Sequence, residues 1–157
     1  MKIPSSLAFG MQTWLEILAD HCYCAHAFTS GFGAESDADC WQVAVDTIQR
    51  FLMCGLIYSP HITKRTNQAE TLDCFRKYTM ELANKYPFAY CPVEMKWFEL
   101  DLCGTEFCRE LLRKHGLYPY TSFSPDILCP PFIEELEDLF EKNGVGWRDA
   151  PLIKIRG

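Results

Sequence analysis

The chain has 157 residues, of which 48% are hydrophobic, 23% charged and 14% aromatic. This length favours a single domain, and the composition is that of a globular protein rather than a fibrous or disordered one. With 15 basic and 21 acidic side chains, the formal net charge at pH 7 is −6. Such a charge argues against binding to nucleic acid, which needs clustered lysine and arginine. It favours a basic protein partner, or else it serves solubility alone.

The cysteines and the N-terminus bear on the compartment. The chain has nine cysteines, none in a C-x-x-C pair, and most stand at apolar positions of predicted elements. This pattern favours reduced thiols in a cytosol over a disulfide framework. The N-terminal segment has one lysine, and Pro4 and Gly10 interrupt its apolar stretch, so it is a poor signal peptide. The longest apolar run, "FLMCGLIY", is too short to span a bilayer. We therefore predict a cytoplasmic protein without a membrane partner.

Helical periodicity dominates the first half of the chain. Thr13 and Glu16 have the spacing of a capping box, which predicts a helix from Thr13 to about Ala27. A second helix is predicted to start near Asp37, with Gly55 as its C-terminal cap. The segment "LIYS" that follows it is typical of a short strand.

The second half adds further helices and a strand. A capping-box pair at Asn67 and Glu70 begins a helix that runs to Pro87, and Thr105 caps a shorter helix through His115. Period-two alternation in "WFELDL" predicts a strand. "LYPYTSFSPDILCPP" is a predicted loop, "PFIEELEDLFEKNG" a helix, and "PLIKI" an edge strand. The predicted fold is therefore mainly α (α+β): one domain over residues 1–157 with a two- or three-stranded β element.

The segment "DHCYCAH" combines two histidines and two cysteines. On a helix, Cys22 and His26 share one face, whereas His21 and Cys24 share another, so one tetrahedral ion cannot bind all four side chains. We interpret Cys22 as a core residue and the histidines as its rim, and we predict no metal, no cofactor and no catalytic residue. The alternative is an enzyme that uses a cysteine nucleophile with a histidine base, or a metal with ligands from elsewhere. The chain has no G-x-S-x-G, H-E-x-x-H or phosphate-loop motif.

The predicted C-terminal helix has an acidic side. Glu134, Glu137, Asp138 and Glu141 fall opposite its apolar residues, and Glu135 flanks them. Carboxylates near a helix N-terminus favour the helix, which is the local explanation for them. Like charges four residues apart nevertheless repel by a few tenths of a kcal/mol. The functional interpretation is a surface complementary to a basic protein.

Two other segments provide candidate contacts with a partner. "AESDAD" is a second acidic group, and the proline-rich loop contains aromatic residues that are suited to anchor an interface. Ordinary loop packing is the alternative explanation for each aromatic residue. The additional candidate residues are Glu35, Asp37, Asp39, Tyr118, Tyr120 and Phe123.

Two segments resemble parts of a winged-helix domain. "DTIQRFLMCGLIYSP" resembles its helix and first strand, and "MKWFELDLCGTEFCREL" resembles a later strand and the closing helix. This resemblance implies a DNA-binding regulator. The match has two departures: Asp101 stands where threonine is usual, and Arg50 is the only basic residue of the second helix, although a DNA-reading helix is expected to be basic.

The chain as a whole resembles the immunity proteins of bacterial polymorphic toxin systems, including contact-dependent growth inhibition. It shares with them its small size, its acidity and its lack of catalytic motifs, and "FEKNGVGWRDAPLIKI" is similar to their C-terminal ends. The resemblance implies a protein that is not an enzyme. It would bind one cognate toxin domain, often a basic nuclease, and occlude its active site. It leaves the oligomeric state open.

Overall fold

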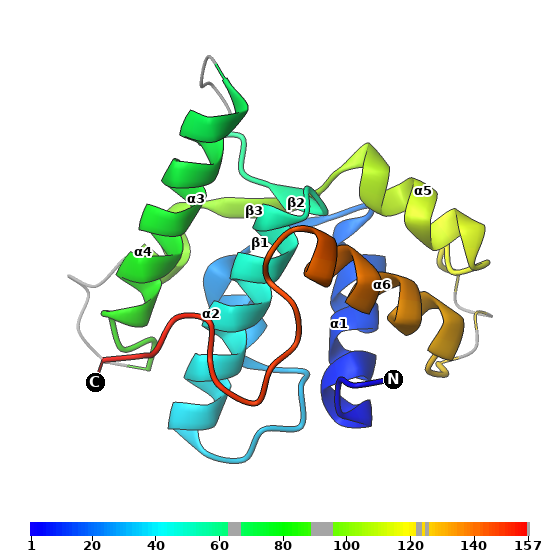
Figure 1. Cartoon of the computed structure of the whole chain (residues 1–157), viewed down its shortest axis with the longest axis horizontal. Helices are drawn as coiled ribbons and strands as arrows, with labels where there is room; N and C mark the ends of the chain where they lie inside the picture. Colours follow the sequence, from blue (N-terminus) through cyan, green and yellow to red (C-terminus); the bar gives the residue numbers. More distant parts are fainter. Residues whose placement is uncertain (63–66, 89–95, 122–123, 125, 157) are drawn as a thin grey trace.

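The computed structural model describes residues 1–62, 67–88, 96–121, 124 and 126–156. In chain order its elements are α1 (Ser5–Leu18), β1 (Cys22–Cys24), the 3₁₀ helix η1 (Ala25–Thr29), α2 (Asp37–Met53), β2 (Ile57–Tyr58), α3 (Gln68–Ala83), α4 (Lys96–Glu99), β3 (Asp101–Gly104), α5 (Glu106–Lys114) and α6 (Pro130–Lys142). Helices surround a small sheet in which β3 lies between β1 and β2 and is antiparallel to both (Figure 1). The mainly helical fold class, with one small β element, is thus confirmed. Among the described residues, no helix is both long and apolar enough to cross a membrane.

Local capping signals predicted most helix ends correctly. The side chains of Ser36, Asn67 and Thr105 each accept a hydrogen bond from the backbone amide three residues later, which satisfies a free donor at the start of α2, α3 and α5. Gly55 and Gly116 end α2 and α5 with φ of 69° and 71°. Glycine adopts this left-handed conformation readily, as a helix C-terminus of this type requires.

The first helix differs from its prediction. It begins at Ser5, directly after Pro4, and ends at Leu18, so Thr13 lies inside it and caps nothing. Proline is favoured at the start of a helix because its missing N–H is not needed there. Gly10 also lies inside α1, where a Cβ atom would clash with the Phe32 ring and a neighbouring carbonyl group. This glycine therefore permits close packing and does not interrupt the helix.

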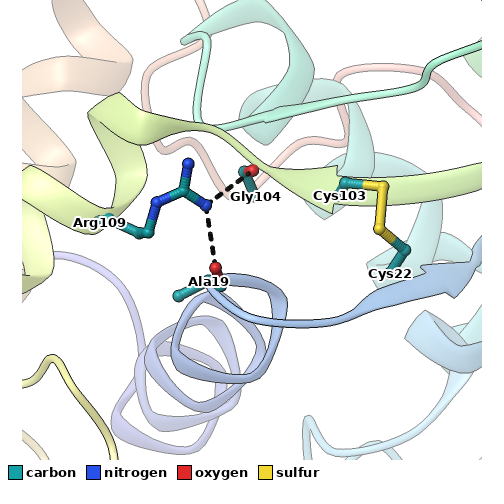
Figure 2. The surroundings of a disulfide bond; sticks show 5 residues. All are labelled: Ala19, Cys22, Cys103, Gly104 and Arg109. Atoms are coloured by element: carbon teal, nitrogen blue, oxygen red, sulfur yellow. Dashed lines mark hydrogen bonds between the residues drawn. A yellow bond between two sulfur atoms is a disulfide. The ribbon is translucent and has the colours of Figure 1, made fainter.

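The segment "DHCYCAH" is not helical, because β3 provides a pairing partner for it. β1 pairs with β3 in the register Cys22 opposite Cys103, and Gly104 lies so close to the end of α1 that a Cβ atom would clash with the Leu18 carbonyl. Arg109 of α5 closes this corner: its Nη1 donates to the carbonyl oxygens of Ala19, at 2.9 Å, and Gly104, at 3.5 Å (Figure 2). The tertiary contact therefore overrides the helical spacing of this segment.

A disulfide bond joins β1 to β3 at the same register position. The Cα atoms of Cys22 and Cys103 are 4.4 Å apart, and their sulfur atoms are bonded (Figure 2). Cys22 is exposed and Cys103 is buried. Two predictions are therefore wrong: Cys22 is not a core residue, and not all the cysteines are free thiols. The bond fastens a strand of three residues to the sheet.

Two strand predictions near the C-terminal half need correction. "WFELDL" begins in the short helix α4, and only its last two residues enter β3. "PLIKI" forms no strand. Ile153 is instead held by side chains of α2: its amide donates to Asp46 at 3.2 Å, and its carbonyl oxygen accepts from Gln42 at 2.8 Å.

Helix α2 is the centre of the fold. It packs against α3 and η1, and the C-terminal segment 143–156 passes over it from the end of α6 to the end of α3 (Figure 1, orange to red). Leu15, Phe51, Leu112 and Phe132, from four different helices, are fully buried in one core. Gln42, Asp46 and Arg50 recur every four residues along α2, so they form one polar stripe facing the C-terminal segment.

The disulfide bond predicts a measurable contribution to stability. The two cysteines are 81 residues apart in the sequence, so the bond removes much chain entropy from the unfolded state. We expect the variant Cys22→Ala/Cys103→Ala to lose about 2–4 kcal/mol of unfolding free energy, measured by urea denaturation with tryptophan fluorescence. Dithiothreitol should destabilise the unmodified chain similarly and leave the variant unchanged. An unmodified chain that is equally stable with and without dithiothreitol would contradict the prediction.

Candidate functional site

The acidic residues of α6 do not form one free face. Glu135 Oε1 accepts from Lys114 Nζ at 2.7 Å, and its other oxygen lies 2.6 Å from His115 Nε2. Glu141 is paired with Arg148. These hydrogen bonds to basic groups lower the pKa of Glu135 and Glu141. Two of the five predicted carboxylates are therefore neutralised within the chain.

The environment of Glu137 contradicts the prediction that it belongs to a solvent-exposed acidic face of α6. It is buried, with 8% of its surface exposed, and its Oε1 accepts from the backbone amides of Lys2 and Ile3. The Ile3 side chain is in the core with 1% exposure. The N-terminal segment therefore packs against the side of α6 that carries Glu137. Glu137 satisfies two backbone donors, one of them buried, and belongs to the fold rather than to a partner surface.

Glu134 and Asp138 are what remains of the acidic face. Both are exposed, and neither is paired with a basic group in the part of the chain that the structure describes. They lie four residues apart on one side of α6, where two like charges repel weakly.

The second acidic group lies at the start of α2. Glu35, Asp37 and Asp39 are all exposed. Asp39 accepts from the Ser36 hydroxyl at 2.7 Å, and Asp37 accepts from the Tyr86 hydroxyl at 3.0 Å. These partners are neutral, and in the described ranges no lysine or arginine forms an ion pair with the three carboxylates. Their negative charge is therefore uncompensated, apart from the favourable field of the helix N-terminus.

A row of aromatic rings lies beside this acidic end. The ring of Phe98 stacks on His26 with centroids 4.7 Å apart, Phe88 lies 6.0 Å from His26, and Tyr86 lies 5.5 Å from Phe88. Phe98 is 49% exposed and Tyr86 is 42% exposed, whereas the two middle rings are half-buried. Tyr86 also meets the buried Trp41 edge-on at 5.5 Å. The row is thus exposed at the surface and fixed to the core at one end.

Tyr86 connects the aromatic row to the acidic group, because its hydroxyl donates to Asp37. The same hydrogen bond raises the pKa of Tyr86. We call the combined region the acidic–aromatic surface; it consists of Glu35, Asp37, Asp39, Tyr86, Phe88, His26 and Phe98. Carboxylates attract lysine and arginine side chains, and ring faces bind the same cations. The arrangement is therefore suited to a basic protein surface.

Sequence reasoning found the acidic half of this surface and missed the aromatic half. The rings come from η1, from the segment that follows α3 and from α4, and they meet only through tertiary packing. No local spacing in the sequence marks them as neighbours. The alternation read as a strand in "WFELDL" even placed Phe98 in the wrong kind of element.

The predicted aromatic anchors of the proline-rich loop have different environments. Tyr118 is half-buried; its hydroxyl donates to Asp20 at 2.8 Å, and its ring faces the Arg113 guanidinium at 5.0 Å. These contacts give Tyr118 a structural role. Tyr120 is 49% exposed and stays a candidate contact. Phe123 lies outside the described residues.

The thiols give limited support to a cysteine enzyme. The sulfur of Cys22 is bonded to Cys103 and is therefore neither a free nucleophile nor a free metal ligand. Cys54 and Cys108 are buried, and burial raises the pKa of each thiol to about 12, so both are protonated and unreactive at neutral pH. Within the described ranges, no three histidine, cysteine or acidic side chains are grouped so that they would hold a metal ion.

Arg50 also bears on the winged-helix interpretation. It is 1% exposed, and its Nε donates to the Val145 carbonyl oxygen at 3.0 Å. The only basic residue of the second helix is therefore turned into the protein, where it cannot reach a DNA phosphate.

Comparison with known proteins gives no assignment: no protein family, no curated protein and no solved structure matches this chain.

Glu137 and Asp138 provide a direct test of the two kinds of carboxylate on α6. Glu137→Ala removes the acceptor of two amides, one of them buried, and we expect it to cost about 1–3 kcal/mol of unfolding free energy. Asp138→Ala changes an exposed carboxylate and should stay within about 0.5 kcal/mol of the parent. Urea denaturation of both variants measures the difference. Equal stabilities would show that Glu137 does not hold the N-terminal segment.

Proposed function

We propose that this chain is an immunity protein, which binds a cognate bacterial toxin domain of basic charge and occludes its active site without turnover. The observation that carries the proposal is the contact between Tyr86 and Asp37, which joins uncompensated carboxylates and exposed aromatic rings into one surface. Interfaces that bind tightly combine these two properties, because charge guides the encounter and buried rings slow dissociation.

The charge supports a basic partner. The chain has a net charge of −6, and Glu35, Asp37 and Asp39 concentrate three negative charges within five residues. A nuclease binds an anionic substrate in a positively charged cleft. An acidic inhibitor is attracted to that same cleft and therefore competes with the substrate. No cofactor, nucleic acid or membrane is part of the proposal.

The aromatic row supplies the lasting contact. The exposed fraction is 49% for Phe98 and 42% for Tyr86. Rings held by neighbouring rings lose little conformational entropy when a partner covers them, which favours affinity. The stacking of Phe98 on His26 at 4.7 Å provides this rigidity.

This surface is a better interface than the acidic side of α6. Glu135, Glu137 and Glu141 are already engaged by groups of the same chain, so a partner would have to break those contacts. The carboxylates at the start of α2 have no such competitor among the described residues, apart from the neutral hydroxyls of Ser36 and Tyr86.

The proposal places the protein in the cytoplasm, where a nuclease toxin would act. Cytosolic glutathione keeps most thiols reduced, which opposes the Cys22–Cys103 bond. Neither cysteine belongs to the acidic–aromatic surface. We therefore expect binding of the toxin to persist when the bond is reduced.

The proposal predicts a toxin domain encoded in a neighbouring reading frame, and the test uses that domain, made as an inactive variant. Glu35→Lys/Asp39→Lys reverses two charges at the start of α2, and Glu134→Lys/Asp138→Lys reverses two on α6 as the matched control. Stopped-flow association at low salt should slow at least tenfold for the first pair, and the effect should shrink at high salt. The second pair should stay close to the parent rate.

The aromatic half needs its own variant. Phe98→Ala should leave the association rate nearly unchanged and raise the dissociation rate about tenfold or more, as loss of a central anchor does. Co-expression with the active toxin should show the matching loss of protection in a growth assay. No binding to the toxin domain would overturn the function. A larger effect of the α6 pair would move the interface to α6 and overturn this surface.

A further inference from the structure

A pocket of about 150 Å³ lies between α1, α2 and the C-terminal segment. Its walls are largely apolar and include Leu7 and Met11 of α1, Val43 of α2, and Trp147 of the C-terminal segment. Cavities of this volume hold a molecule the size of benzene. None of its lining residues belongs to the acidic–aromatic surface.

Arg50 is the unusual residue of this pocket, because it is a buried cation with incomplete partners. Its exposed fraction is 1%. The guanidinium has five N–H donors, of which Nε donates to Val145 at 3.0 Å and Nη2 to Gly146 at 3.4 Å. Nη1 donates to no acceptor among the described residues, and Arg50 forms no ion pair with a carboxylate there.

This arrangement leaves the charge of Arg50 only partly compensated. Asp46, one helical turn earlier, attracts this charge without forming an ion pair with it. The direct contacts of the guanidinium are two carbonyl oxygens and the rings of Phe140 and Trp147, at 5.8 and 5.1 Å. A buried charge is costly unless it is paired and hydrogen-bonded, and burial accordingly lowers the pKa of Arg50. A carboxylate in the pocket would provide an ion-pair partner and accept from the free donors.

Two acidic residues of the pocket restrict the ligand. Asp46 lies one helical turn before Arg50, and its Oδ1 accepts from the Ile153 amide at 3.2 Å. Asp149 also lines the pocket, as does Arg148, whose charge is already paired with Glu141. These negative charges disfavour a dianion such as phosphate, because like charges repel at short range. A single carboxylate can bind Arg50 while the rest of the ligand contacts the apolar walls.

We propose that this pocket binds a small monocarboxylate with a flat apolar body, with the carboxylate on Arg50 and the body against Trp147. The assignment combines a cavity, a buried guanidinium with a free Nη1, and the Trp147 side chain in the same wall. It does not rest on the proposed toxin binding.

Benzoate is the probe for this proposal, with benzamide as its uncharged counterpart and phosphate as the dianion. We expect saturable benzoate binding to the full chain, with a dissociation constant on the order of millimolar for so small a ligand. Ligand-observed NMR and the shift in melting temperature would measure it. Benzamide should bind at least tenfold more weakly, and phosphate should not compete.

Two variants show whether the binding occurs in this pocket. Arg50→Met should abolish benzoate binding, but it also removes hydrogen bonds to the C-terminal segment. Val43→Phe therefore serves as the second variant: it fills the pocket from a half-buried position and leaves Arg50 in place, so benzoate binding should fall at least tenfold. Leu72→Phe, at a half-buried position on α3, is the matched control and should bind like the parent.

The proposal is overturned if benzoate and benzamide bind equally, if benzoate does not bind at tens of millimolar, or if folded Val43→Phe binds benzoate as well as Leu72→Phe does. Circular dichroism confirms that each variant is folded. A benzoate effect that is lost in Val43→Phe and kept in Leu72→Phe supports the pocket.

Discussion

The burial of α2 is the constraint on which the other features depend. This helix is covered by α3, η1 and the C-terminal segment, so its polar stripe of Gln42, Asp46 and Arg50 must find partners inside the protein. The C-terminal segment provides them with its backbone groups. Its path across α2 is therefore set by hydrogen bonds from side chains rather than by strand pairing. The same path covers the pocket that contains Arg50, and it leaves the first turn of α2 exposed.

Much of the helical fold could be predicted, because the signals that decide it are local. Asn67 and Thr105 cap their helices within three residues of sequence, and Gly55 ends α2 through its own backbone conformation. The failures occur where a distant partner decides the structure. Residues 22–24 become a strand because β3 pairs with them, and "PLIKI" does not become one because α2 side chains bind its backbone first.

The candidate site shows the same division between local and distant information. Helical spacing correctly placed Glu134 and Asp138 on the exposed side of α6. It could not show that Lys114 approaches Glu135 from another helix, or that the N-terminal amides approach Glu137. The net charge of a helical face is therefore a poor guide to its free charge. Only the contacts with other elements distinguish a carboxylate that binds internally from one that is available to a partner.

Asp37 of the acidic–aromatic surface and Arg50 of the pocket lie near opposite ends of α2, and stability accounts for only part of each site. A carboxylate in the first turn and a guanidinium in the last turn both suit the helix dipole, so Asp37 and Arg50 each have a local reason to be present. That reason does not require a row of exposed rings beside Asp37, nor a buried guanidinium that forms no ion pair with a carboxylate of the described residues. An exposed lysine would favour the helix end without the desolvation cost. Thirteen residues of helix separate Asp37 from Arg50 by about 20 Å, although the pocket wall extends back along α2 to Gln42. The charges of these two sites exceed what folding requires. Binding to a partner or a ligand would account for them.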